Sequence, residues 1–246
     1  MTHIGDQAII VRDRFLFGTG YVDEETGVRF DVYSPASHPQ QWRTYLEGAE
    51  NIYHQRGLAD GSAWRALENG DGVGLFFVAT NESGEAIAGI RFHGPLRSID
   101  EAATLTEMAS SSEIEDIRAV IASRLDDGII EMKGMWALGK SVTGVALSDA
   151  LVRTHLVAMQ WLGAAYVYNT SAERQIELGR RCGVATIWDV PVFYPDERYK
   201  TVAMTFEYEA TLDLCQPSHR VAHLSDLAQL ELASAVRGQS PDSLSS

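Results

Sequence analysis

One segment, from Met132 to Val184, restricts the fold of this chain more than any other part of the sequence. It begins with an apolar strand and a loop that contains glycine. It continues with a long apolar helix at about 145–162, a second strand that ends in Asn169, and a polar helix. The first residues of a helix carry backbone N–H groups that have no acceptor within the helix, and these groups can bind an anion. The segment therefore predicts a sheet flanked by helices, with a site for a phosphorylated cofactor where the long helix begins.

The rest of the chain alternates between strand and helix patterns, and no change in composition marks a boundary between domains. We therefore expect a single domain of the α/β (α+β) class over residues 1–246, with a mixed sheet and helices on both of its faces. The elements expected outside the segment are an N-terminal hairpin (with a strand over residues 8–17) and a helix at about 40–56, both within residues 7–57, a second hairpin over residues 74–94, helical segments to about residue 125, two strands up to about residue 208, a C-terminal helix at about 224–236 and a disordered tail at 238–246. In the helix at about 40–56 the apolar positions at helical spacing are Trp42, Leu46, Ala49 and Tyr53.

Charge and cysteine content narrow the classes of function. The chain has 34 acidic and 20 basic side chains, a formal net charge of -14, so general binding to nucleic acid is not expected. No run approaches the roughly 18 apolar residues of a membrane span, and the first residues do not resemble a signal peptide. Cys182 and Cys215 have neither a CxxC nor a Cys/His metal spacing, so we expect no metal and a cytoplasmic protein.

The turn before the long helix resembles the phosphate-binding signature of the GNAT acyltransferases, which is Gln or Arg, two residues, Gly, one residue, then Gly or Ala. Gly144 and Ala146 match this frame, and Ser141 stands at its first position. Asn169 and Ala172 also match the family's spacing after the helix. The resemblance implies a mostly antiparallel GNAT-like sheet with its core at about residues 75–206, and acyl-CoA as co-substrate. The residues that it assigns to cofactor binding are Leu138, Lys140, Ser141, Val142, Thr143, Gly144, Val145, Ala146 and Asn169.

The resemblance is incomplete at the family's usual general acid. A GNAT enzyme commonly has a Tyr in the helix that follows the second strand, but no Tyr occurs between Ala172 and Gly183. The proton for the departing thiolate would then come from another residue, and Tyr194 and Tyr199 are two alternatives.

A second resemblance is to the acyl-homoserine-lactone synthases and N-acyl amino acid synthases. The hairpin sequence from Gly89 to Pro95 is similar to theirs, and Glu131 stands where they have a Glu before the cofactor loop. This resemblance implies a donor with a long acyl chain, on CoA or on an acyl carrier protein, as an alternative to acetyl-CoA.

Glu131 is the best candidate for the catalytic base, because an acid on a central strand is costly unless it has a task or a partner. The alternative is a salt bridge with Lys133, which lies on the same face of the strand. On an ideal pleat, Trp136 shares the opposite face with Ile130 and Met132. Trp136 either lines an acyl channel or belongs to the core.

Arg91 either binds a substrate carboxylate or is a solvated residue of the sheet. His93 is a weak base candidate beside a Gly-Pro pair, and His155 is more simply a structural histidine. Cys182 has no evident His partner in the sequence and is expected to be inert.

These features predict an acyltransferase that moves an acyl group from acyl-CoA, or from an acyl carrier protein, to the amine of a small molecule or amino acid. The alternative is a catalytically inactive GNAT-fold module that senses a ligand or binds a protein. Oligomeric state stays open, with a homodimer as one alternative.

Overall fold

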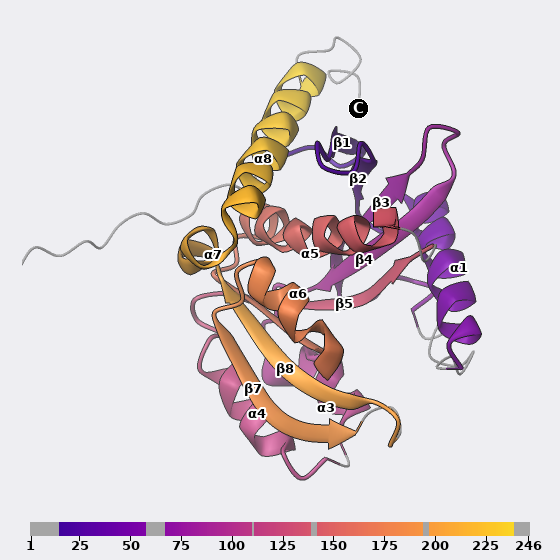
Figure 1. Ribbon diagram of the computed structural model, residues 1–246. Coiled ribbons are helices and arrows are strands. Elements are labelled where there is room, and N and C mark those ends of the chain that lie inside the picture. Colours follow the sequence, from indigo (N-terminus) through magenta and orange to yellow (C-terminus); the bar gives the residue numbers. More distant parts are fainter. Residues whose placement is uncertain (1–14, 58–66, 110, 139–141, 194–196, 239–246) are drawn as a thin grey trace, which may run out of the picture.

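The computed structural model describes residues 15–57, 67–109, 111–138, 142–193 and 197–238, without the side chains of residues 142–146, 188–192 and 238. One eight-stranded sheet runs through the molecule in the order β1-β2-β3-β4-β5-β6-β8-β7 (Figure 1). Only the pair β5–β6 is parallel, and all the other pairs are antiparallel. The strands are β1 (Thr19–Val22), β2 (Arg29–Tyr33), β3 (Val73–Thr80), β4 (Ala86–His93), β5 (Ile129–Ala137), β6 (Tyr166–Ala172), β7 (Thr186–Phe193) and β8 (Lys200–Glu207).

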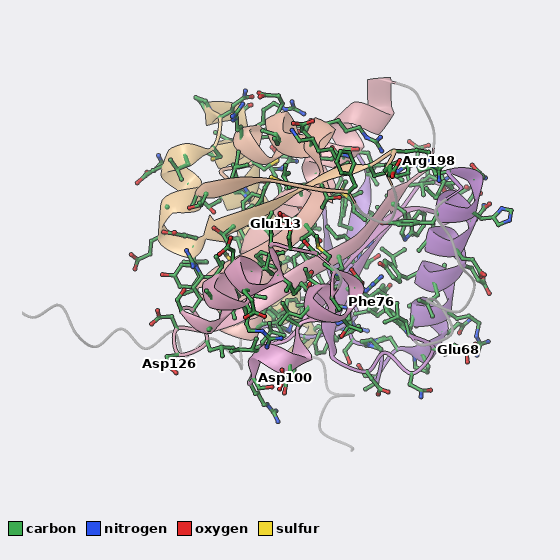
Figure 2. All side chains as sticks on the ribbon, turned by 90° about the horizontal axis from the view of Figure 1, so that it is seen from below. Glu68, Phe76, Asp100, Glu113, Asp126 and Arg198 are labelled. Carbon is green, nitrogen blue, oxygen red and sulfur yellow. The ribbon has the colours of Figure 1, made fainter. Side chains whose placement is uncertain are left out.

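Helices cover both faces of this sheet, as the sequence predicts. Helix α5 crosses one face together with α8, whereas α1 and the segment α3–α4 cover different parts of the other face (Figures 1 and 2). The helices are α1 (Pro39–Gln55), η1 (Ile99–Glu101), α3 (Ala103–Glu107), α4 (Ile114–Ala122), α5 (Val142–Leu162), η2 (Glu173–Gln175), α6 (Ile176–Arg181), α7 (Tyr208–Leu214) and α8 (Pro217–Gly238). No helix in the described ranges is long and apolar enough to cross a bilayer.

Core residues lie on both faces of the sheet, because side chains alternate along the strands. Phe77 on β3 and Ile90 on β4 pack under α5 in the larger cluster. Phe76, the neighbour of Phe77, lies on the opposite face, where it contacts Trp42 of α1 at a ring distance of 5.0 Å (Figure 2). Because period-2 alternation places neighbours on opposite faces, one hairpin supports both layers of helices.

Strand β5 departs from the ideal pleat at a β-bulge. Gly134 has a φ of +59°, and β5 has two residues between Lys133 and Trp136 where β4 has one. A bulge of this kind inserts one residue and reverses the side-chain alternation beyond it. The prediction for Trp136 is therefore wrong: it packs with Tyr45 and Phe76 on the α1 face, the face of Glu131 and Lys133.

Two other differences from the sequence-based prediction lie near the chain ends. Residues 8–14 of the predicted strand over 8–17 lie outside the described residues. Phe15 and Phe17 are described and are not in a strand; both rings stack on Trp161 of α5, with centroids 4.9 and 5.0 Å from it. Strand β1 begins at Thr19. At the other end α8 begins at Pro217, earlier than expected, and α7 precedes it; residues 239–246 lie outside the described ranges.

Candidate functional site

The candidate site begins where strands β5 and β6 part. Their parallel pairing covers only three residue pairs and ends at Glu131 opposite Tyr168. Among the residues that the structure describes, β5 pairs beyond this junction only with β4, and β6 pairs only with β8. Backbone groups on the inner edges of the two strands therefore have no strand partner beyond the junction. We call this the β5–β6 opening.

Helix α5 begins next to the β5–β6 opening, five residues after β5 ends. Val142, Thr143, Gly144, Val145 and Ala146 form the first turn and part of the second of α5. The N–H groups of a first turn have no acceptor inside the helix and carry a partial positive charge. Helix α5 starts at Val142, three residues before the predicted start at Val145. Lys140 and Ser141 lie outside the described residues.

Leu138 follows the last residue of β5. Its backbone N–H donates to the carbonyl oxygen of Ile87 at 2.8 Å and is therefore engaged within the sheet. Backbone groups of successive strand residues point to opposite edges, so those of Ala137 are turned toward the β5–β6 opening.

Two side chains of β6 contribute oxygens that have no hydrogen-bond partner among the described residues. Asn169 is 7% exposed and its Oδ1 is unpartnered, as is the hydroxyl of Ser171. Both residues follow the junction with Glu131 and, by alternation from the buried Val167, face the α5 side of the sheet. Buried polar atoms without partners are rare in proteins, and a bound ligand is one way to satisfy them.

Glu131 is fully buried at the junction, and its carboxylate accepts hydrogen bonds from the first backbone N–H groups of helix α3. Oε2 accepts from the N–H of Ala103 at 2.8 Å, and Oε1 accepts from the N–H of Thr104 at 2.9 Å and from the Thr104 hydroxyl. Lys133 Nζ lies 3.3 Å from Oε1 and also pairs with Glu107. Burial opposes ionisation, but Lys133 and the Thr104 hydrogen bonds outweigh it and lower the pKa of Glu131.

The predicted salt bridge between Glu131 and Lys133 is therefore confirmed. Sequence reasoning did not detect the contacts from α3, because α3 is only five residues long and has no strong periodicity. An acidic residue on a buried strand, with a short helix earlier in the chain, is the only signal that the sequence offered.

Arg91 lies on the same face as Glu131, under helix α1. It is 6% exposed, so the interpretation as a solvated sheet residue is wrong. Its Nε donates to Nε2 of His93 at 2.9 Å, and its Nη1 donates to the hydroxyl of Tyr45 at 3.3 Å. The Tyr45 hydroxyl in turn donates to the carbonyl oxygen of Gly134 at 2.7 Å, at the bulge.

These contacts fix the protonation states of the two neighbours of Arg91. Burial and the adjacent Arg91 charge lower the pKa of His93 to about 4, so the ring is neutral at pH 7 and carries its hydrogen on Nδ1. Burial raises the pKa of Tyr45 to about 12, so this phenol keeps its proton. The group positions an arginine and a neutral histidine beside the bulge in β5. Tyr45 was not among the apolar positions that the sequence pattern assigned to α1.

Tyr168 stands opposite Glu131 across the junction. Its hydroxyl is buried and has no hydrogen-bond partner among the described residues. Burial, with the charges of Glu131 and Glu107, raises its pKa, so the phenol stays protonated. The sequence did not single out Tyr168 as a general acid, because the resemblance to the GNAT acyltransferases places this acid in the helix that follows the second strand.

The turn between β7 and β8 lies against the end of α1. The hydroxyl of Tyr199 donates to the carbonyl oxygen of Arg56 at 3.3 Å, and Arg198 Nη2 donates to that of Gly57 at 3.5 Å (Figure 2). Because α1 covers β3–β5 and the turn belongs to the other part of the sheet, this contact joins the two parts beyond the opening. Tyr194 lies outside the described residues.

His155 is a structural histidine, as predicted. Its Nδ1 is 2.6 Å from the carbonyl oxygen of Val152, its Nε2 is 3.3 Å from the Thr211 hydroxyl, and its ring packs on Phe206. Burial lowers the pKa of His155 to about 4. Cys182 is buried, and burial raises the pKa of its thiol, so the thiol is a poor nucleophile.

Comparison with known proteins identifies relatives of this chain by sequence and solved structures with a similar fold. No protein-family model matches the chain. Uncharacterized proteins Rv1356c of Mycobacterium tuberculosis and Mb1391c of Mycobacterium bovis are each 30% identical to it over 190 residues, which cover 77% of this chain and 72% of theirs.

Three solved structures share the architecture. FeeM, an N-acyl amino acid synthase from uncultured soil microbes, matches with a TM-score of 0.60 at 11% identity over 78% of this chain and 95% of its own. MesI, a CoA-dependent acyl-homoserine lactone synthase, has a TM-score of 0.50 at 12% identity over 79% and 93%. An uncharacterized Bacillus halodurans protein has 0.51 at 10% over 86% and 99%. At these identities the likeness concerns the fold, and the predicted GNAT-like fold is confirmed.

Proposed function

This chain belongs to the same protein family as Rv1356c and Mb1391c and has a GNAT-like fold, and we propose that it is an acyltransferase. The donor is acyl-CoA or an acyl carrier protein, and the acceptor is the amine of a small molecule or amino acid. The observation that carries the proposal is the β5–β6 opening beside the first turn of α5. An extended thioester arm fits between strands whose inner edges lack partners, with its phosphates at the helix start.

The proposed contacts to the cofactor form two groups, those to its phosphates and those to its pantetheine arm. The N–H groups at the start of α5 bind the pyrophosphate, and the small residue Gly144 lets it approach the backbone. The unpartnered oxygens of Asn169 and Ser171 and the inner-edge groups of Ala137 bind the amides of the pantetheine arm. Lys140 adds a positive charge near the phosphates in this proposal, and Trp136 belongs to the wall behind β5 that limits the site on the α1 side.

In the transfer, the amine nitrogen attacks the thioester carbonyl carbon, a C–N bond forms, and the C–S bond breaks. The nitrogen loses a proton, and the departing thiolate gains one. We propose that Glu131 draws the proton from the nitrogen through a water molecule, because its two oxygens already accept three hydrogen bonds. Its lowered pKa keeps it ionised.

The Tyr168 hydroxyl is the proposed proton donor to the thiolate. It is protonated, unpartnered and located at the junction where the reacting thioester would lie. Arg91, on the same face, is proposed to bind an acceptor carboxylate, with Tyr45 and His93 holding its guanidinium in place.

The first test is thermal unfolding with acetyl-, medium-chain and long-chain acyl-CoA. A ligand that binds only the folded state raises the melting temperature, by an amount that grows with its concentration over Kd. Gly144→Glu should abolish the increase, because a carboxylate in the first turn of α5 repels the phosphates. It should not unfold the protein, because acidic residues are favourable near a helix start.

A matched control is Gln40→Glu, which adds the same charge to the exposed first turn of α1, away from the β5–β6 opening. This variant should keep the full increase in melting temperature. No increase with any acyl-CoA in the wild type, or equal increases in wild type and Gly144→Glu, would refute the phosphate site.

A catalytically inactive ligand-binding module is the second candidate, because the hydrogen bonds of Glu131 serve the packing of α3. Release of free thiol from acyl-CoA across a panel of amines distinguishes the two functions. Acyl-CoA binding with no thiol release in the wild type would favour the module over the enzyme.

A further inference from the structure

A second group of polar side chains lies away from the β5–β6 opening, where three helices meet. Asp149 of α5, Cys182 at the end of α6 and His219 of α8 place their ligand atoms within 4.8 Å of one another, and all three residues are buried. Thiolate, imidazole and carboxylate are the ligands that proteins use for zinc. They come from positions far apart in the sequence, so no sequence spacing could reveal them.

The hydrogen bonds of His219 prepare this ring for a cation. Its Nδ1 lies 2.8 Å from the carbonyl oxygen of Arg181, which can only accept, so Nδ1 carries the hydrogen. The lone pair of Nε2 is then available. A metal-binding histidine usually donates its other ring N–H to a backbone carbonyl in this way, which fixes its tautomer and orientation.

Asp149 is held by a second contact. Nε and Nη2 of Arg181 donate to its Oδ1 at 3.1 and 2.8 Å, so both bonds end on one oxygen and Oδ2 can bind a cation. These bonds also fix the carboxylate relative to the end of α6. The positive charge of Arg181 lies on the outer side of Asp149 and is 32% exposed.

A second buried histidine lies one helical turn beyond His219. His223 is 1% exposed, hydrogen-bonds the backbone of Cys182, and has no partner for Nε2 among the described residues. Two histidines at positions i and i+4 share one face of a helix.

We propose that Asp149, Cys182 and His219 bind a zinc ion that fastens α8 and the end of α6 to α5, with His223 as the candidate fourth ligand. Tetrahedral zinc has bond lengths near 2.3 Å to sulfur and 2.0–2.1 Å to nitrogen, so the ligand atoms must approach by about 1 Å. On binding, the Cys182 thiol loses its proton to solvent and with it the hydrogen bond to the Asp149 carbonyl oxygen at 3.7 Å, while the thiolate, the imidazole and the carboxylate each form a bond to the ion. Because the group is buried, the ion has a structural role.

The test uses Co²⁺ in place of Zn²⁺ on the full chain after removal of metal with a chelator. A thiolate bound to Co²⁺ gives a near-ultraviolet charge-transfer band, and the chain has only two cysteines, Cys182 and Cys215. The wild type should bind one equivalent, show the band, and lose it when Zn²⁺ is added. Cys215→Ser should keep the band, because Cys215 is also buried but does not belong to the group.

Cys182→Ser should lose the band, and His219→Gln should bind Zn²⁺ at least about tenfold more weakly. A Gln at 219 can still donate an N–H to the Arg181 carbonyl, so this variant should fold. Far-ultraviolet circular dichroism checks folding, and the comparison of wild type with Cys215→Ser stays decisive if Cys182→Ser does not fold. No band in the wild type would show a hydrogen-bonded core without an ion, and loss of the band in Cys215→Ser would assign the bound thiolate to Cys215; either result would overturn the proposal.

Discussion

At the scale of single residues, the protein buries several ionisable groups, and one group contains more acids than its single base can neutralise. Arg153 of α5 is fully buried; it pairs with Asp23, with Glu25 at 2.9 Å and with Asp226 at 4.0 Å. One Oδ of Asp226 and the hydroxyl of Tyr21 have no partner among the described residues. One guanidinium facing three carboxylates leaves an excess of negative charge in a buried place, so one acid is expected to stay protonated.

Asp226 is that acid, because burial raises its pKa from 3.8 to about 8, against the opposing effect of Arg153. The folded state then keeps a proton that the unfolded state releases above about pH 4. The free energy of unfolding contributed by Asp226 is present at low pH and is lost as pH rises from about 4 through 8.

Asp226→Asn should remove this dependence, since a neutral amide resembles the protonated acid. Relative to wild type, the variant should gain stability between pH 5 and 8, by at most about 1.4 kcal/mol per pH unit. Urea unfolding at several pH values measures the difference, and Asp213→Asn at an exposed ion pair is the control. A difference between variant and wild type that does not change with pH would contradict the raised pKa.

Tyr168 allows the clearest separation of catalysis from folding. Its hydroxyl has no partner among the described residues, so Tyr168→Phe removes no hydrogen bond from the folded state. We expect unchanged or slightly higher thermal stability, because an unpartnered buried polar group is unfavourable. Removal of a general acid should lower kcat by about 10²–10⁴-fold.

Thiol release under saturating acyl-CoA measures this effect, together with the acyl-CoA-induced increase in melting temperature. The increase should persist in Tyr168→Phe, since the proposed role concerns the leaving group. Wild-type kcat in the variant would remove Tyr168 from the mechanism while leaving the cofactor site in place.

At the scale of elements, the sequence predicted most helices and strands because hydrophobic period and turn residues are local signals. The hairpin β3–β4 and helix α1 agree with the prediction within one or two residues. The face of β5 beyond Gly134 was wrong, because a bulge depends on how two strands align and not on the pattern of one. The face of α1 was partly wrong as well: Tyr45 and Ile52 are buried, where the pattern had placed Leu46 and Tyr53.

From the sequence, the candidate site could be predicted only where its residues lie within one continuous segment of the chain. The resemblance pointed to the start of α5 and to Asn169, and the cofactor roles of both stay predictions. The partners of Glu131, Arg91 and Tyr168 come from distant elements, so no spacing in the sequence could supply them. The pKa values of these groups depend on side chains that approach them only when α1 and α3 pack on the sheet.

Close packing of α1 on β5 gives a prediction at this scale. A Cβ added to Gly48, in the middle of α1, would lie 2.3 Å from the ring of the buried Trp136. Alanine favours a helix over glycine by about 1 kcal/mol, but overpacking of a core typically costs about 1–3 kcal/mol. The two effects together should lower the free energy of unfolding of Gly48→Ala by up to about 2 kcal/mol, measured by urea unfolding.

Gly179→Ala in α6 is the matched control. The added Cβ would meet the sulfur of Met204 at 2.8 Å, and a flexible methionine side chain can move away. This variant should be as stable as wild type or slightly more stable. If Gly48→Ala behaves like Gly179→Ala, α1 can move away from Trp136, and the wall of the proposed site is less rigid than the contacts indicate.

At the scale of the whole molecule, the sheet consists of two parts joined along one edge by only three residue pairs. Strands β1–β5 form one part and β6, β8 and β7 the other, with the turn at Tyr199 touching α1 beyond the opening. A ligand arm between β5 and β6 would therefore act as a bridge between the two parts, in addition to occupying a site on either one. Binding of the ligand should therefore change hydrogen exchange on the facing edges of both β5 and β6.

Hydrogen exchange with and without acyl-CoA tests this arrangement. Amides of residues 132–137 on β5 and 169–172 on β6 should exchange more slowly with ligand, because amides facing the opening gain partners or lose contact with water. Amides of β1 and β2, at the far edge of the sheet, should not change beyond the general stabilisation. Protection confined to the start of α5 would mean that the phosphates bind but the arm does not lie between the strands, and the acyl group would then have no route to Glu131 and Tyr168.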